Sequence, residues 1–354
     1  MQRELLELLI CPVCRGELTW SVREEQGGDV LAAQGTCPGG HAYEIRDGVA
    51  GMLAAGGPDP WEENVSGIER ALAEHPEIAQ ALFAPQPDAL GPADRFLRVQ
   101  LLQARGQFDL AEEEYEKAAE AVYGRASVEA TSAAVATAVR TLATGEGPIL
   151  DIASGPGTLV RELLGQSARP VIATDISAWV LRRLRAQAAA LGLPVGRLSL
   201  LVCDARRLPL RDGAVQDIST MEGIGNVAFA AAMESRRLRR GAALELLAEW
   251  RRVGTRLTSV QSLLSPWNVV HRVVLGYLGA AALLYPAPLR ALLAAAGWRA
   301  VSETGITLVH RPTPRSELLR GTRIDGLPLV PVRASTECLV AVRVEEPHAR
   351  VRAG

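Results

Sequence analysis

The sequence predicts an α/β fold with a doubly wound sheet, preceded by a small cysteine-containing module and a helical segment. Three apolar, strand-like runs each end in an acidic residue, at Asp151, Asp175 and Asp204, and helix-like segments separate the runs. A glycine-containing turn follows the first run. The chain has 354 residues, more than the usual ~100–200 of one domain, so we expect further modules around the sheet.

The first of these modules, residues 1–55, contains potential metal ligands. Cys11 and Cys14 form a Cys-x2-Cys pair, and Cys37 and His41 form a second pair after a polar loop. These ligands suit a closed tetrahedral zinc site, which is structural because no position stays open for water. Zinc would stabilise a module that is too small to bury much of a core. The alternative is a metal-free turn with reduced thiols.

The motifs CPVC and CPGGH resemble the zinc ribbons at the N-terminus of bacterial ribosomal-RNA guanine methyltransferases. They are also similar to the small zinc-ribbon activator of tRNA and protein methyltransferases. The resemblance covers about residues 5–53 and implies one structural zinc ion. The remaining cysteines, Cys203 and Cys338, lie in strand-like runs, so we expect them to be core residues.

Residues 56–125 are expected to form a helical linker or cap. The stretch AAGGPDP is typical of a linker, and a helical pattern runs from Trp61 to about Leu142. The acidic segment AEEEYEKAAEAV is most simply a solvated helix face with an apolar stripe. Alternatively, Tyr115 or Tyr123 in this region covers a ligand cleft at the sheet.

The segment ILDIASGPGTLV predicts a strand, a tight turn and the start of a helix. Gly155 and Gly157 let the backbone approach a ligand closely. A dinucleotide motif would have a third glycine, but Val160 occupies that place. Asp151 would repel a pyrophosphate but attract a cation, such as S-adenosylmethionine with its ammonium and sulfonium groups. The alternative is an ordinary strand-turn-helix without a ligand.

Together these motifs resemble the class I S-adenosylmethionine-dependent methyltransferases over roughly residues 126–345, and we assign residues 126–354 to such a Rossmann-like domain. The resemblance implies that Asp151 and the glycine turn lie near the methionine part of the cofactor. It places Asp175 at the ribose and Asp204-Ala205 at the adenine edge. Ala153 departs from the pattern, because the family has its first glycine there.

A fourth strand is expected from Ala214 to Thr220, followed by the run MEGIGN. In the family this loop borders the transferring methyl group, so the resemblance implies that Met221, Glu222 and Asn226 line the substrate side. Glu222 is the candidate for orienting or deprotonating the methyl acceptor. The alternative is an acid that caps the following helix. An Asn/Asp-Pro-Pro-Tyr run is lacking, which argues against adenine and glutamine acceptors.

An apolar insertion is expected at about residues 264–285, after a fifth strand. It suggests a lid over a hydrophobic substrate or a membrane-surface contact, and a buried core helix is the alternative. His271 in this segment is a candidate proton acceptor, although a histidine in an apolar stripe is more often a core residue. The longest apolar run, Val273 to Tyr285, is shorter than the ~20 residues of a spanning helix. We therefore expect no transmembrane segment, and without a targeting segment we expect a cytoplasmic protein.

The net charge of -2 conceals an asymmetry between the two parts of the chain. Residues 1–150 hold 11 basic and 24 acidic residues, whereas residues 151–354 hold 27 basic and 16 acidic residues. The basic part could face an anionic substrate, but solvated surfaces with some interdomain pairing are the simpler explanation. The most compact basic cluster runs from Arg236 to Arg240.

The resulting functional hypothesis is a methyltransferase that uses S-adenosylmethionine and acts on a small molecule, which the apolar insertion would make lipophilic. An RNA base in rRNA or tRNA is the alternative acceptor, favoured by the ribbon and the basic C-terminal part. A non-catalytic activator or scaffold that keeps the fold is the second alternative. The oligomeric state is left open by the sequence.

Overall fold

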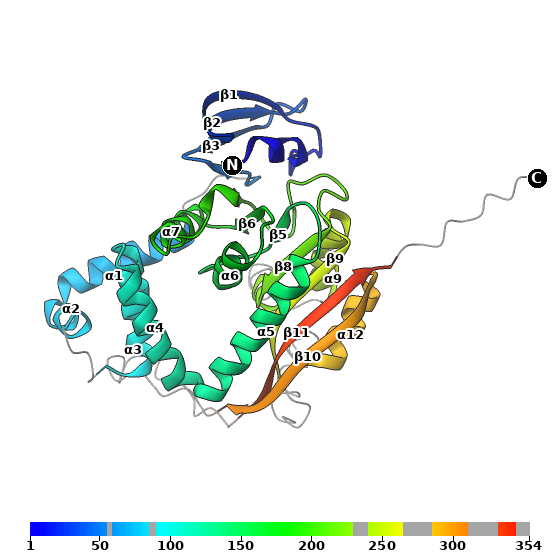
Figure 1. The fold of residues 1–354 in the computed structure, drawn as a ribbon. Helices are drawn as coiled ribbons and strands as arrows, with labels where there is room; N and C mark the ends of the chain where they lie inside the picture. Colours follow the sequence, from blue (N-terminus) through cyan, green and yellow to red (C-terminus); the bar gives the residue numbers. More distant parts are fainter. Residues whose placement is uncertain (55–58, 85–89, 229–239, 265–284, 311–331, 345–354) are drawn as a thin grey trace, which may run out of the picture.

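The structure is a computed structural model that describes residues 1–54, 59–84, 90–228, 240–264, 285–310 and 332–344 (Figure 1). The strands are β1 (Thr19–Gln26), β2 (Asp29–Thr36), β3 (Ala42–Arg46), β4 (Val49–Gly51), β5 (Ile149–Asp151), β6 (Val171–Asp175), β7 (Leu198–Val202), β8 (Asp217–Met221), β9 (Arg256–Leu264), β10 (Trp298–His310) and β11 (Val332–Arg343). The α-helices are α1 (Pro60–Glu74), α2 (Pro76–Leu82), α3 (Pro92–Ala104), α4 (Phe108–Tyr123), α5 (Arg125–Ala143), α6 (Thr158–Gln166), α7 (Ala178–Ala190), α9 (Arg240–Val253) and α12 (Pro286–Ala295). Two short 3-10 helices, η1 (Arg3–Leu8) and η2 (Val195–Arg197), complete the described elements.

All these strands belong to one mixed sheet in the order β1-β2-β3-β4-β7-β6-β5-β8-β9-β11-β10. The pairs from β7 to β9 are parallel, and β11 pairs antiparallel with both β9 and β10. The chain moves from β5 outward to β7 and then returns to place β8 on the other side of β5. The winding direction therefore reverses between β5 and β8, which is where open α/β sheets bind ligands. This topology confirms the predicted doubly wound α/β fold.

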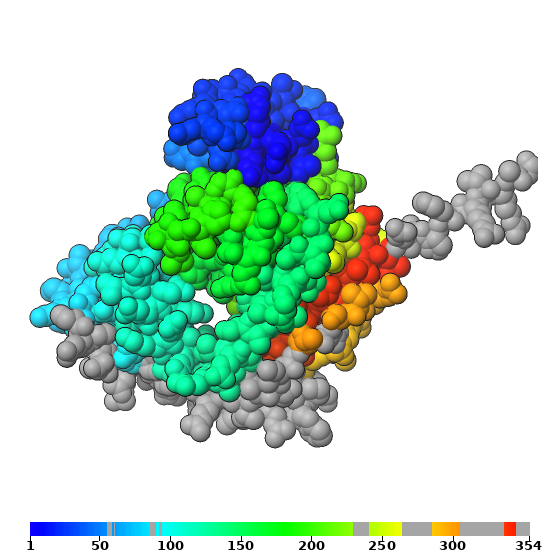
Figure 2. Space-filling view, in the orientation of Figure 1, coloured from blue at the N-terminus to red at the C-terminus, as the bar shows by residue number. Residues whose placement is uncertain are grey.

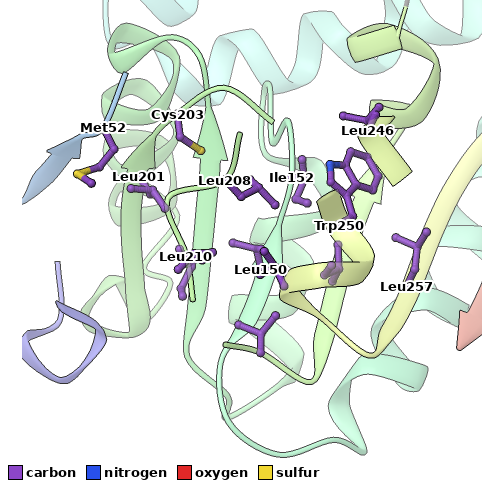
Figure 3. Close-up of a cluster of buried hydrophobic side chains, with 14 of the residues drawn as sticks. Met52, Leu150, Ile152, Leu201, Cys203, Leu208, Leu210, Leu246, Trp250 and Leu257 are labelled. Carbon is purple, nitrogen blue, oxygen red and sulfur yellow. The ribbon is translucent and has the colours of Figure 1, made fainter. Parts of the chain in front are cut away.

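Alternating side chains of the central strands face two separate hydrophobic cores. In β5, Ile149 packs in a core with α5, α6 and α7, whereas Leu150 packs in the core with α9 and α12. This period of two is what a strand buried on both faces requires. Figure 3 shows part of the second core, where Ile152 lies near Trp250 of α9 and Leu201 belongs to the same cluster.

The N-terminal module, residues 1–54, extends this sheet and shares its core. Strand β4 pairs in parallel with β7, with Val49 opposite Leu200 and Gly51 opposite Val202. Met52 follows β4 and lies in the same buried cluster as the central strands (Figure 3). The module therefore shares both the sheet and a hydrophobic core with the central strands.

The helical cap, formed by α1 to α4, lies beside the sheet domain (Figure 1). Glu112 of α4 accepts hydrogen bonds from Arg161 of α6 and Gln187 of α7, both at 3.0 Å. Asp59, the N-cap of α1, accepts hydrogen bonds from the Ser177 hydroxyl and the Trp179 amide at the start of α7. These contacts hold the cap against α6, which follows the glycine turn, and against α7.

The predicted secondary structure around the sheet agrees with the structure to within a few residues. The expected fourth strand is β8 and the expected fifth strand is β9; α12, β10 and β11 follow in the described part of the chain. The apolar insertion, His271 and most of the Arg236–Arg240 cluster lie outside the described residues. Within the described part of the chain, no helix has the length and apolarity to cross a membrane.

Candidate functional site

The turn after β5 is built from backbone conformations that favour glycine. Gly155 has φ +51° and Gly157 has φ +78°. A Cβ added to Gly157 would lie 2.0 Å from Cδ1 of Leu184, whereas one added to Gly155 would meet only a backbone oxygen at 4.0 Å. Gly157 is therefore required by packing, and Gly155 leaves open space above the turn. Ala153 also has a positive φ, +56°, which explains why a glycine suits this position.

Asp151 lies at the carboxyl end of β5 with 2% of its surface exposed. Its carboxylate accepts a hydrogen bond of 2.6 Å from the Ser219 hydroxyl in β8. Burial raises the pKa of Asp151 to about 6, and the charge of Asp175 contributes to the rise. Hydrogen bonds from Ser219 and Ser154 oppose it. A buried carboxylate with few partners has a net preference for a cation in the space above it.

Asp175 ends β6 beside this turn, as predicted. Its carboxylate accepts hydrogen bonds from the Gly155 amide at 3.0 Å and the Ser177 amide at 3.1 Å. Burial raises its pKa, and the hydrogen bonds from Ser177 and Gly155 oppose that rise. The structure thus brings two of the predicted acids and the glycine turn together at one edge of the sheet.

Asp204 follows β7 and is engaged by a neighbour along the chain. Its carboxylate pairs with the guanidinium of Arg206 at 2.7 Å and accepts the Arg206 amide at 2.9 Å. The carbonyl oxygen of Ala205 accepts a hydrogen bond from Nε1 of Trp250 in α9. These contacts hold the predicted adenine edge in place.

A cavity of about 590 Å³ opens between the cap and the sheet domain, and we call it the α4–α5 cavity. It is lined by Tyr115, Ala119, Tyr123, Ser127, Val128, Thr131, Ser132, Val135, Ala136, Thr158, Glu162, Met221, Glu222 and Ser262. Figure 2 shows an opening between the cyan α4, the blue-green α5 and the green part of the sheet domain. The lining includes Thr158, which directly follows the glycine turn, so the cavity adjoins the predicted cofactor site.

Glu222 lines this cavity from the end of β8. Its carboxylate accepts a hydrogen bond of 2.7 Å from the Ser262 amide in β9. Burial raises the pKa of Glu222, and the hydrogen bonds from Ser262 oppose that rise. The residue has φ +59°, a strained conformation for a non-glycine residue, and such strain is often concentrated at functional sites.

Of the other residues expected on the substrate side, Met221 also lines the cavity, but Asn226 does not. Asn226 is exposed one helical turn further on, and its amide donates to the Glu222 carbonyl. Asp59 was not predicted as a site residue, but its carboxylate lies close enough to Asp175 to raise the pKa of Asp175 by charge repulsion. The signal that marks Asp59 is the following Pro60, since Asp at the N-cap before Pro is typical of a helix start.

The predicted metal ligands also meet in space. One ligand atom from each of Cys11, Cys14, Cys37 and His41 lies within 4.8 Å of all the others. The Cys14 and Cys37 sulfurs are 3.5 Å apart, and Nδ1 of His41 is 3.2 Å from the Cys37 sulfur. Ligand atoms around one tetrahedral zinc ion lie about 3.5–4 Å apart, so the cluster has the size of such a site.

The chemistry of the Cys11 thiol suits metal binding as well. Burial alone would raise its pKa, but hydrogen bonds from the Cys14 amide and the Tyr43 hydroxyl lower it to about 6. The thiolate form, which binds metals, is therefore favoured at neutral pH.

The cluster is connected to the sheet domain near Asp204. The Ile10 amide donates to the Pro209 carbonyl at 3.0 Å, and the Arg211 amide donates to the Leu8 carbonyl at 2.9 Å. The chain that precedes the ligands thus pairs with the loop that follows Asp204.

Comparison with known proteins identifies the chemistry of this sheet edge. Residues 149–239, which include β5 to β8, match the family model of a methyltransferase domain. The chain carries a methyltransferase domain. The match and the observed topology support a methyltransferase enzyme of Rossmann-like fold.

Similar solved structures differ widely from this methyltransferase in sequence, and no curated protein matches the chain. The BH2331 protein of Bacillus halodurans has 14% identity and a TM-score of 0.43, covering 60% of this chain and 99% of its own. A SAM-dependent methyltransferase of Methanosarcina mazei has 14% identity and a TM-score of 0.40, covering 59% and 98%. Magnesium protoporphyrin IX methyltransferase of Synechocystis, with bound SAH, has 16% identity and a TM-score of 0.36, covering 60% and 82%.

Proposed function

We propose that this methyltransferase transfers the methyl group of S-adenosylmethionine to a small, largely apolar molecule in the α4–α5 cavity. The observation that carries the proposal is the cavity itself, about 590 Å³ in volume and adjoining the glycine turn. Small-molecule sites typically have volumes of about 300–1,000 Å³ and a mostly apolar lining with a few polar groups. Alanine, valine, methionine and tyrosine side chains supply that lining here, with hydroxyls and two carboxylates between them.

The proposed cofactor residues are those at the ends of β5, β6 and β7. Asp151 would attract the positive charge of the methionine part, and Gly155 and Gly157 would allow the backbone to approach it. Asp175 would accept hydrogen bonds from the ribose hydroxyls, in addition to those from the protein backbone. Asp204 and Ala205 would border the adenine. Ala153 in the turn completes the set of residues that we propose for the cofactor site.

The methyl donor supplies an activated methyl carbon, so the protein has chiefly to align the acceptor with it and to exclude water. The cap helices close one side of the cavity, and the ends of β8 and β9 close another. We assign Glu222 the role of binding or deprotonating the acceptor, because it is a partly buried acid of the cavity lining whose pKa is raised by burial. His271 remains a second candidate for this role.

We also propose a structural zinc ion held by Cys11, Cys14, Cys37 and His41. Four protein ligands leave no open position for a reacting water, so the ion would support the ribbon and would not take part in catalysis. The shared core of ribbon and sheet adds a second source of stability to this region.

An RNA base is the weaker acceptor proposal. RNA binding relies on lysine and arginine side chains that neutralise phosphates. The described residues that line the α4–α5 cavity include none of these, and two of them are acidic. An RNA enzyme would bind RNA with a steep salt dependence, which neutralising the Arg236–Arg240 cluster would weaken.

Calorimetric titration with S-adenosylhomocysteine tests the proposed function, with zinc content measured on the same sample. Wild type should bind one equivalent saturably, and Asp175→Ala should lose most of that affinity because the ribose loses its acceptor. Asp109→Ala, which changes an exposed acid of α4, serves as the matched control and should bind like wild type. If folded, zinc-loaded wild type binds no S-adenosylhomocysteine, the enzyme assignment is wrong, and a non-catalytic activator or scaffold becomes the better hypothesis.

A further inference from the structure

The lining of the α4–α5 cavity has a distinctive charge pattern. Glu222 and Glu162 contribute carboxylates, Tyr115 and Tyr123 contribute aromatic rings, and none of the described lining residues is lysine, arginine or histidine. Arg161 lies close enough to affect the pKa of Tyr115, but its guanidinium is paired with Glu112 at 3.0 Å. Among the groups that the structure describes, this cavity therefore disfavours an anionic ligand and favours a cationic one.

The two tyrosine rings are positioned before any ligand binds. Phe96 of α3 contacts both, with its ring centroid 6.0 Å from each. The tyrosines remain 40% and 49% exposed, so their rings are accessible to a ligand. Aromatic rings attract cations through the negative charge of their faces, most strongly where water is excluded.

Glu222 lines the sheet side of the cavity, and Tyr123 lines the same cavity from α4. The charge of Glu222 contributes to the raised pKa of Tyr123, after the larger effect of burial. The Ser262 amide donates a hydrogen bond to the Glu222 carboxylate, and the backbone at Glu222 has a strained, positive φ. A strained backbone that carries a partly buried acid into a cavity is typical of a functional residue.

We propose that the methyl acceptor is a small amine, which binds as its ammonium between Tyr115, Tyr123 and Glu222 before Glu222 removes a proton from it. This proposal rests on the proposed function, because it needs the methyl donor in the adjoining site. It names the acceptor atom as nitrogen, and it makes the two tyrosines specificity residues for a cationic group.

The proton and electron balance of the step is simple. Glu222 accepts one proton from the ammonium and becomes a neutral carboxylic acid, leaving a lone pair on the nitrogen. That pair forms the new nitrogen–carbon bond as the methyl carbon–sulfur bond breaks, and its electrons stay on sulfur. The products are a methylated ammonium and neutral S-adenosylhomocysteine. Burial favours the first transfer, since it lowers the pKa of an ammonium and raises that of a carboxyl group.

The test uses three probes that share a phenyl ring and similar size: 2-phenylethylamine, 2-phenylethanol and 3-phenylpropanoate. Each is titrated calorimetrically into the full-length, zinc-loaded protein saturated with S-adenosylhomocysteine. We expect the amine to bind about tenfold or more tightly than the alcohol, and the carboxylate not to bind detectably. Glu222→Gln should remove most of the amine preference, because it should weaken amine binding far more than alcohol binding. Glu129→Gln, an exposed acid of α5 outside the lining, is the matched control.

Two further measurements examine the rings and the proton transfer. Tyr123→Leu should weaken amine binding more than alcohol binding, whereas Tyr123→Phe should keep the amine preference because the ring remains. With S-adenosylmethionine and 2-phenylethylamine, the rate at which the N-methylated amine forms, measured by mass spectrometry, should increase as the pH rises through the pKa of Glu222.

The outcomes separate the two proposals. Absence of S-adenosylhomocysteine binding in the wild-type protein would refute the proposed function itself. Normal S-adenosylhomocysteine binding with no amine binding, with equal binding of amine and alcohol, or with carboxylate binding would overturn the amine assignment alone. An amine preference that survives in Glu222→Gln would also overturn it.

Discussion

Replacement of Asp151 by asparagine should stabilise the cofactor-free protein at neutral pH and should weaken binding of S-adenosylmethionine. The carboxyl group of Asp151 is buried at the end of β5 and has a pKa of about 6 in the folded protein. An aspartate in an unfolded chain has a pKa of about 3.9. Folding therefore opposes ionisation at this site, and asparagine has no charge to bury.

The magnitude follows from the two pKa values. Because the folded pKa is the higher one, this group contributes most stability below about pH 4, and its contribution falls as the pH rises to about 6. Each pKa unit corresponds to about 1.4 kcal/mol, so ionised Asp151 costs about 3 kcal/mol at pH 7.5. Between pH 5 and pH 7.5, the advantage of Asp151→Asn over wild type should grow by about 1.4 kcal/mol.

Urea unfolding of both proteins at several pH values between 5 and 8, followed by tryptophan fluorescence, measures this difference. If the new amide beside Ser219 is itself destabilising, that cost does not depend on pH. It would change the difference in unfolding free energy by the same amount at every pH and would leave its pH dependence unchanged. The reasoning is refuted if the difference between the two unfolding free energies stays constant over this range, or shrinks as the pH rises. Calorimetry with S-adenosylmethionine on the same proteins checks the expected loss of affinity.

Two other predictions concern the glycine turn and the metal. Gly157→Ala should destabilise the protein by about 2 kcal/mol or more, because its Cβ would collide with Leu184 at a positive φ, whereas Gly155→Ala should cost about 1 kcal/mol and mainly reduce cofactor affinity. Denaturation curves together with S-adenosylhomocysteine titrations distinguish these results, and equal stability losses in the two variants would contradict the packing argument. Removal of zinc by a chelator, or Cys14→Ser, should lower the melting temperature and also weaken S-adenosylhomocysteine binding, because the ribbon pairs with the loop after Asp204. Unchanged cofactor affinity in a metal-depleted, folded sample would show that the ribbon does not support that loop.

The sequence predicted those features that are specified by residues close together in the chain. Apolar runs that end in Asp151 and Asp175 marked two parallel strands, because buried strands are continuously apolar and ligand-binding acids collect at their carboxyl ends. The glycines at 155 and 157 marked the turn, because few other residues adopt its positive φ values. The spacing of the cysteines and the histidine indicated the Cys/His cluster, because its four residues lie in two short local pairs.

Other features were not predicted because they depend on distant parts of the chain. Asn226 was expected on the substrate side; it lies one turn of helix after Glu222 and is not among the residues that line the α4–α5 cavity. The contact of Asp59 with Ser177 joins residues far apart in sequence, and no local pattern encodes such a pairing. The same is true of the Ser219 hydroxyl that faces Asp151 from the neighbouring strand.

The sequence by itself predicted the doubly wound sheet, the glycine turn after the first strand and the four cysteine and histidine residues that cluster, because each is specified by residues close together in the chain. Only the tertiary structure decided that the N-terminal module extends the main sheet through the pairing of β4 with β7. It also decided that α4 and α5 line a cavity to which Tyr123 and Glu222 both contribute. Edge pairing and cavity shape are set by how separate elements pack against each other, so they appear only once the chain has folded.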